Sequence, residues 1–133
     1  FGIKKERIIF AERMGLDDHY SRHYCGDLFL DTFNYNAATT ASIALDCGLP
    51  IITLLGKSFC ARIGACSLSA CNLNELITHT PSEYEELAYE LATNQEKLKE
   101  IKEKIRRKEN CSFFDSSQYT KDLERIYSNL ISN

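Results

Sequence analysis

The sequence predicts an α/β fold in which helices cover both faces of a parallel sheet, giving three layers. Two continuous apolar runs, "DLFLD" (27–31) and "PIITLL" (50–55), have the composition of strands that are buried on both faces. A helical pattern occupies 39–47 between them and ends at Gly48, where Gly-Leu-Pro forms a helix stop. Buried strands that alternate with helices imply parallel pairing through right-handed crossovers.

Three shorter segments are also predicted to form strands or helices. "RIIF" (7–10) is rich in β-branched residues and is predicted as a further parallel strand. "DDHYSRHYC" (17–25) opens with two aspartates, which favour a helix N-terminus, and is predicted as a short helix. "ELITHT" (75–80) has the length and composition of a last short strand.

The rest of the chain is predicted to be helical. Small and apolar residues at helical spacing indicate a helix in 58–72, beginning near Phe59. Segment 82–94 carries an apolar stripe, and 95–109 repeats apolar residues among charges, as is typical of a solvated helix rather than a partner-binding one. A closing helix is predicted at 117–131, where hydroxyl residues that cap helices well begin the segment.

Composition excludes several classes of protein. The length of 133 residues suits one domain, and 16 basic against 19 acidic residues leave no strongly basic surface for nucleic acid. No apolar run approaches the roughly 20 residues that span a bilayer, and the first residues lack a signal-peptide core. Because the chain also does not begin with Met, we expect a soluble, cytoplasmic fragment of a larger protein.

The cysteines are predicted to be reduced and mostly buried, because no pair has Cys-x-x-Cys spacing and no secretory signal is present. They are Cys25, Cys47, Cys60, Cys66, Cys71 and Cys111. The histidines His19, His23 and His79 do not combine with them in a zinc-like spacing, so no metal site is expected.

The segment "NYNAATT" (34–40) is the candidate binding loop. It follows the 27–31 strand, and ligands of doubly wound sheets bind beyond the carboxyl ends of strands. Exposed N–H groups and two hydroxyls at Thr39 and Thr40 would suit a phosphate at a helix N-terminus. The same composition is typical of a capped connection, and neither a Gly-x-Gly-x-x-Gly motif nor a Walker lysine accompanies it. Asp31, which precedes the loop, is interpreted as a cap or turn residue rather than a catalytic one.

A longer pattern surrounds this loop. "HYSRHYCGDLFLDTFNYNAATTASIALDCGLPIITLLGKSFCARIGACSL" contains His-x-x-Arg, Asp-x-Phe-Leu-Asp-Thr, a small-residue loop with Thr-Thr, and Gly-x-Pro before an apolar strand. Gly56 and Arg62 follow it. This order of motifs resembles the carboxyl-terminal lobe of the peptide O-GlcNAc transferase and SPINDLY-like family. The tail "FFDSSQYTKDLERIYSNL" resembles the closing helix of that family, so the resemblance spans nearly the whole chain.

The resemblance implies a GT-B glycosyltransferase, in which two Rossmann-like lobes face each other. Residues 1–133 would form the nucleotide-sugar-binding lobe, with 110–133 as its closing helix segment. The implied reaction transfers N-acetylglucosamine from UDP-GlcNAc to Ser or Thr hydroxyls of proteins, without a metal cofactor. By position, His19 packs by the nucleotide base, Arg22 lies close by, and the Thr39–Thr40 pair holds the diphosphate. No catalytic residue falls within the chain; the acceptor groove and helical repeats of about 34 residues would lie upstream.

Two residues depart from the family's pattern. Ala38 replaces a histidine before the Thr-Thr pair, and Ile43 replaces an acidic residue that binds the ribose hydroxyls. We expect Ile43 to face the ribose. The departures leave two alternatives open: a degenerate lobe that serves as a protein-interaction module, and a lobe that takes a GDP-sugar, as SPINDLY-like relatives do. His23 is expected at the surface, and Arg62 is either a site residue or a buried tie to a carbonyl.

Overall fold

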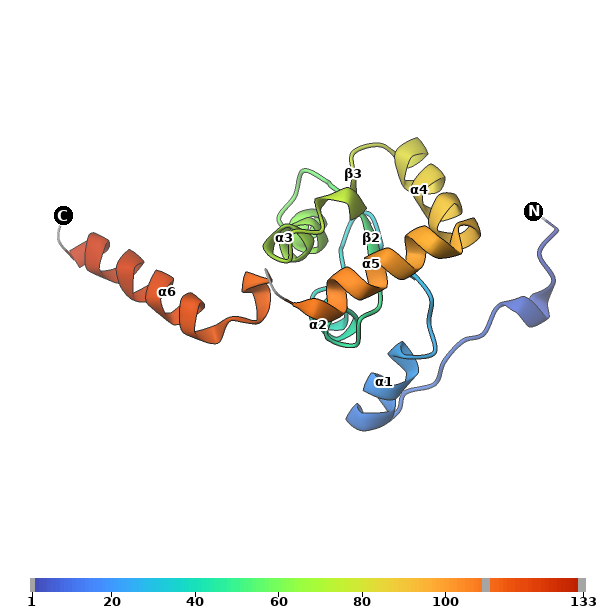
Figure 1. Ribbon diagram of the computed structural model, residues 1–133, viewed down its shortest axis with the longest axis horizontal. Coiled ribbons are helices and arrows are strands. Elements are labelled where there is room, and N and C mark those ends of the chain that lie inside the picture. Colours follow the sequence, from blue (N-terminus) through green and yellow to red (C-terminus); the bar gives the residue numbers. More distant parts are fainter. Residues whose placement is uncertain (1, 109–110, 132–133) are drawn as a thin grey trace.

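The computed structural model describes residues 2–108 and 111–131 (Figure 1). In these residues the strands are β1 (Phe29–Leu30), β2 (Ile51–Leu54) and β3 (Ile77–Thr78). The α-helices are α1 (Leu16–His23), α2 (Thr39–Asp46), α3 (Ile63–Ala70), α4 (Pro81–Thr93), α5 (Gln95–Arg107) and α6 (Ser116–Ile131). Short 3₁₀ turns are η1 (Lys5–Arg7), η2 (Cys60–Arg62), η3 (Asn74–Leu76) and η4 (Ser112–Phe114).

The sheet is parallel, with strand order β1-β2-β3. Phe29 pairs with Ile51, and Thr53 pairs with Ile77, so β2 is the central strand. Helices α2 and α3 contact each other and β2, whereas α4 contacts β2, β3 and α5. Figure 1 shows α3 on one side of the sheet and α4 on the other. The three-layer α/β fold predicted from the sequence is confirmed.

The predicted strand at 7–10 is wrong. Arg7 ends the turn η1, and residues 8–10 have no regular secondary structure. Ile9 is 88% exposed and Phe10 is 90% exposed. A strand exists only where a neighbour completes its hydrogen-bond ladder, and no described segment pairs with this run.

The hydrophobic core lies between the sheet and its helices. Its fully buried large side chains include Leu45, Ile51, Ile52, Leu68, Leu73, Leu76 and Leu91. The charged helix α5 also contributes to the core, through its apolar residues Leu98, Ile101 and Ile105. Residue 109, which the sequence pattern includes in this helix, lies outside the described residues.

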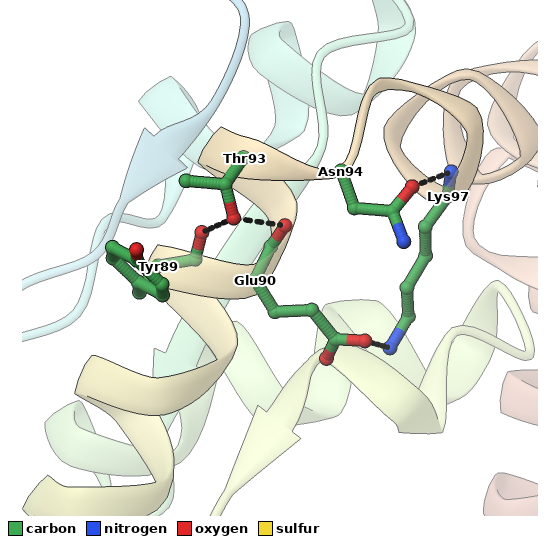
Figure 2. Close-up of polar contacts among 5 residues, drawn as sticks. All are labelled: Tyr89, Glu90, Thr93, Asn94 and Lys97. Carbon is green, nitrogen blue, oxygen red and sulfur yellow. Dashed lines mark hydrogen bonds and ion pairs between the residues drawn. The ribbon is translucent and has the colours of Figure 1, made fainter.

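A side-chain cap separates α4 from α5 (Figure 2). Thr93 ends α4, and its hydroxyl donates to the carbonyl oxygen of Tyr89 at 2.8 Å. The next residue, Asn94, accepts a hydrogen bond from the backbone N–H of Lys97 at 3.1 Å. An ion pair of 2.7 Å between Lys97 Nζ and Glu90 Oε1 crosses the junction. One asparagine therefore ends one helix and begins the next.

The closing helix is present as α6, and none of its residues is buried. Figure 1 shows α6 extending away from the rest of the fold, at the opposite end from the N-terminus. Residues 110 and 132–133 of the predicted closing segment lie outside the described residues. Within the described part of the chain, no helix is long and apolar enough to cross a membrane.

A disulfide joins Cys71 to Cys111, 40 residues apart in the sequence. The prediction that all six cysteines are reduced is therefore wrong for this pair. The packing of the segment after α5 beside the end of α3 brings the two sulfurs together, and no local spacing motif reveals it. The other four cysteines are free: Cys47 is buried, Cys60 is half-buried, and Cys25 and Cys66 are exposed.

Candidate functional site

The loops that follow β1 and β2 meet at the carboxyl edge of the sheet, where doubly wound folds bind ligands. The first loop runs from Asp31 to Ala38, and the second from Leu55 to η2. The backbone N–H of Asn36 donates to the carbonyl oxygen of Cys60 at 2.9 Å, so a direct hydrogen bond joins the two loops.

Asp31 anchors the first loop from within. Its side chain is buried, with 3% exposure. One carboxylate oxygen, Oδ1, accepts hydrogen bonds from the backbone N–H groups of Thr32 at 2.9 Å and Ala37 at 2.8 Å. The other, Oδ2, accepts from the hydroxyl of Thr53 on β2 at 2.7 Å. The interpretation of Asp31 as a turn residue is confirmed.

Asn36 is a second buried anchor, which no motif in the sequence singles out. It is 0% exposed. Its Nδ2 donates to the carbonyl oxygen of Thr32 at 2.6 Å, and its Oδ1 accepts from the backbone N–H of Gly64 at 3.3 Å. An asparagine among small residues after a strand is a turn signal. Its partner Gly64 on α3 lies 28 residues away, so local sequence does not predict this contact.

Helix α2 begins at Thr39, as predicted, and its first turn has no side-chain cap. Ala38 occupies the N-cap position, and the side chain of alanine carries no acceptor. The first intrahelical bond runs from the N–H of Ser42 to the carbonyl of Ala38 at 3.0 Å. The N–H groups before Ser42 have no acceptor within the helix, so they and the helix dipole favour an anion at this end.

Ile43 does not face a ligand site. Its side chain is 6% exposed, although it does not belong to the main core cluster. Helix α1 packs against α2, and the thiol of Cys47, one turn beyond Ile43, donates to the carbonyl of Tyr20 at 3.7 Å. The expectation of a ribose-facing Ile43 is therefore wrong, because the side chain is covered by the protein itself.

Helix α1 carries His19 and Arg22, both half-buried. The His19 and His23 rings meet edge to face, with centroids 4.8 Å apart. His23 Nδ1 donates to the carbonyl oxygen of His19 at 2.6 Å. His23 is 6% exposed, so its expected surface position is wrong; the packing of α1 on α2 accompanies its burial.

Desolvation, followed by the charge of Arg22 and by His23, lowers the pKa of His19 below its usual value of 6.5. Among the described residues, no hydrogen bond, ion pair or ring contact joins His19 or Arg22 to Thr39 or Thr40. The four residues lie on two helices in mutual contact, and their shared role in binding stays a prediction.

Arg62 and His79 both lie at the surface. Arg62 is exposed at the junction of η2 and α3, so a buried tie to a carbonyl is excluded. His79 is exposed, and its backbone N–H donates to Glu83 Oε2 at 2.7 Å at the start of α4. The Thr80 side chain accepts from the Glu83 N–H and thereby caps the first turn of α4.

Comparison with known proteins assigns the family. Residues 1–123 match the model of glycosyl transferase family 41. Because that match covers most of the 133 residues, the chain belongs to family 41.

Relatives of the chain come from plants and animals. It is 33% identical over 128 residues to the probable UDP-N-acetylglucosamine–peptide N-acetylglucosaminyltransferase SEC of Arabidopsis thaliana, covering 95% of this chain. It is 29% identical over 126 residues to the UDP-N-acetylglucosamine–peptide N-acetylglucosaminyltransferase of Caenorhabditis elegans, covering 94% of this chain. The chain spans only 13% and 11% of the lengths of these two relatives.

A solved structure shares the fold. The chain superposes with a TM-score of 0.88 and 31% identity on an O-GlcNAc transferase from Thermobaculum terrenum, solved as its K341M mutant. The match covers 95% of this chain and 24% of that one. The parallel sheet and its helices thus correspond to one part of a larger glycosyltransferase.

Proposed function

We propose that the chain is the nucleotide-sugar-binding lobe of a protein O-glycosyltransferase that transfers N-acetylglucosamine from UDP-GlcNAc to Ser or Thr hydroxyls. The observation that carries the proposal is the start of α2. In a chain of family 41, it presents uncapped N–H groups and two threonine hydroxyls at the carboxyl edge of a parallel sheet. The names of the relatives support a UDP-GlcNAc donor and a peptide acceptor.

In this proposal the lobe holds the leaving group. Cleavage of the bond between sugar and diphosphate transfers negative charge to the diphosphate. The α2 N-terminus and the side chains of Thr39 and Thr40 donate hydrogen bonds to it, and the guanidinium of Arg22 supplies positive charge. His19 packs by the base. The nucleophile comes from the acceptor protein, whose binding belongs to the rest of the polypeptide.

The proposal includes no metal ion. A helix N-terminus and an arginine are expected to neutralise a diphosphate directly, which predicts that chelation leaves nucleotide affinity unchanged.

A second function is favoured by one observation. Because the side chain of Ile43 is buried, the position that resembles the family's ribose acceptor offers no hydrogen bond. A lobe without that acceptor could serve protein interaction instead of donor binding. Nucleotide binding separates the two functions.

The test is calorimetric titration of UDP into the complete polypeptide, with GDP and added EDTA as further arms. Thr39→Val and Thr40→Val remove one hydroxyl each at nearly constant volume. Each is expected to weaken UDP binding about tenfold, the scale of one hydrogen bond to a charged group. Thr120→Val, on the exposed helix α6, is the matched control and should leave affinity unchanged.

Each other outcome of this titration has a definite meaning. Absence of UDP and GDP binding by the wild-type protein would favour the interaction module. A preference for GDP over UDP would indicate that the donor is a GDP-sugar. Loss of nucleotide affinity on addition of EDTA would show that the site needs a metal ion.

A further inference from the structure

We infer that Asp31 is a positioning residue for the donor site: with Thr53, it holds the loop that sets the start of α2. The inference rests on the proposed function, because it concerns the same diphosphate-binding end of α2. It adds residues that no motif in the sequence assigns to binding.

The carboxylate of Asp31 closes the loop across its length. Through Oδ1 it accepts from the N–H of Thr32, at the first residue of the loop, and from the N–H of Ala37, two residues before Thr39. Through Oδ2 it accepts from Thr53, which is 0% exposed on the central strand. Both ends of the loop are therefore hydrogen-bonded to the carboxylate of Asp31, which is in turn hydrogen-bonded to the central strand of the sheet.

The surrounding protein leaves this carboxylate little freedom. A Cβ atom at Gly64 would lie 2.5 Å from Asp31 Oδ2 and 2.6 Å from Thr53 Oγ1, so the close approach of α3 requires glycine. On the backbone side, the Tyr84 hydroxyl donates to the carbonyl oxygen of Asp31 at 3.0 Å. Burial, and then the charge of Asp31, raises the pKa of Tyr84 to about 12, so this hydroxyl stays a donor at neutral pH.

Asp31 acts through the loop and does not touch the donor itself. Both carboxylate oxygens are occupied by protein donors, and the residue is 3% exposed. Burial also makes these charge-assisted bonds costly to break, because an unpaired carboxylate away from water is strongly unfavourable. A shift of Ala37 would move the adjacent N–H groups of α2, on whose placement phosphate binding depends.

A matched pair of substitutions tests the inference. Thr53→Val removes the hydroxyl that holds Asp31 Oδ2. Thr78→Val removes an equally buried hydroxyl on β3, which donates to the carbonyl oxygen of Thr53 at 2.9 Å and has no bond to the loop. Each variant loses one buried side-chain hydrogen bond, so a purely structural role of Thr53 would affect the two variants alike.

Two measurements on the complete polypeptide are compared: amide hydrogen exchange of residues 31–41, and UDP affinity by calorimetry. Thr53→Val should accelerate exchange in this segment and weaken UDP binding about tenfold, whereas Thr78→Val should change neither. Asp31→Ala should weaken UDP binding more than Thr53→Val does. Asp31→Asn keeps an acceptor for the two N–H groups and offers an N–H to the Thr53 hydroxyl, so it should restore most of the affinity.

Three outcomes would overturn the inference. Equal effects of Thr53→Val and Thr78→Val would make Thr53 only structural. Faster amide exchange with unchanged UDP affinity would show that the order of the loop does not affect nucleotide binding. Loss of affinity in Asp31→Asn as large as in Asp31→Ala would show that UDP affinity depends on the charge at position 31 and not on the loop contacts that asparagine keeps. A wild-type protein that binds no nucleotide would instead overturn the proposed function, and the positioning role with it, even if exchange showed that Asp31 orders the loop.

Discussion

Ile43 gives the sharpest prediction at the scale of single residues. With a side chain only 6% exposed, Ile43→Asp would bury a carboxylate for which the structure shows no partner. We expect a loss of several kcal/mol in the free energy of unfolding, about the largest effect of a point substitution. Ile43→Val should cost only about 0.5–1.5 kcal/mol. Urea unfolding of the complete polypeptide measures both.

The neighbouring residue Ser42 provides the control. It is half-buried on the same turn of α2, so Ser42→Asp places the same charge one residue away with access to water. It should leave stability nearly unchanged. If Ile43→Asp kept wild-type stability and raised UDP affinity, the side chain would face the ribose after all.

Local sequence identified Asp31 as a turn residue, but not its distant partner, nor the burial of His23 and Ile43. Asp31 was correctly assigned to a turn because aspartate at a strand end is a local signal. Its partner Thr53 lies 22 residues away, and that contact depends on the completed sheet. The burial of His23 and Ile43 likewise depends on the packing of α1 on α2. The resemblance to a family supplied the candidate residues, and burial then corrected one of them.

At the scale of elements, Asn94 tests how far one cap organises two helices (Figure 2). Its side chain accepts from the N–H of Lys97 and satisfies one of the free donors at the start of α5. Asn94→Ala should destabilise the protein by about 1 kcal/mol, whereas Asn94→Asp keeps the acceptor and should match the wild type. Urea unfolding compares the three proteins, and faster amide exchange in 95–98 should accompany the loss. Equal stability of Asn94→Ala and Asn94→Asp would show that the cap contributes nothing.

Helices were predicted more successfully than strands for a physical reason. The start of α2 at Thr39 was predicted as observed, and those of α1, α4 and α6 to within one residue, because caps and apolar periodicity are local. The predicted start near Phe59 was wrong: α3 begins at Ile63, because the 3₁₀ turn η2 precedes it. The run 7–10 has strand composition but no partner in the described chain, and a ladder needs a neighbour. Strands β1 and β3 are also shorter than the runs from which they were predicted, because each pairs with only part of β2.

At the scale of the whole molecule, α5 connects elements that are distant in the sequence. Two of its lysines and the lysine that caps it form ion pairs with three of them. Lys102 pairs with Asp27 before β1, Lys104 with Glu75 in η3, and the C-cap residue Lys108 with Asp46 at the end of α2. Its apolar side enters the core through Leu98, Ile101 and Ile105. Either the ion pairs or the apolar contacts could hold α5 in place, and the two sets are expected to contribute different amounts to the free energy of unfolding.

We predict that the apolar contacts dominate. Ile101 is 7% exposed, and Ile101→Ala should cost about 2–5 kcal/mol through lost burial and the cavity left behind. The Lys104–Glu75 pair is 47% and 41% exposed, so Lys104→Met, which keeps the apolar stem, should cost about 0–1 kcal/mol. Urea unfolding of the two variants of the complete polypeptide compares these values. The wild type provides an independent check, because about 1 M NaCl weakens the attraction between solvent-exposed charges. Little loss of stability in salt is expected, whereas a loss as large as that of Ile101→Ala would show that the ion pairs hold α5 on the fold.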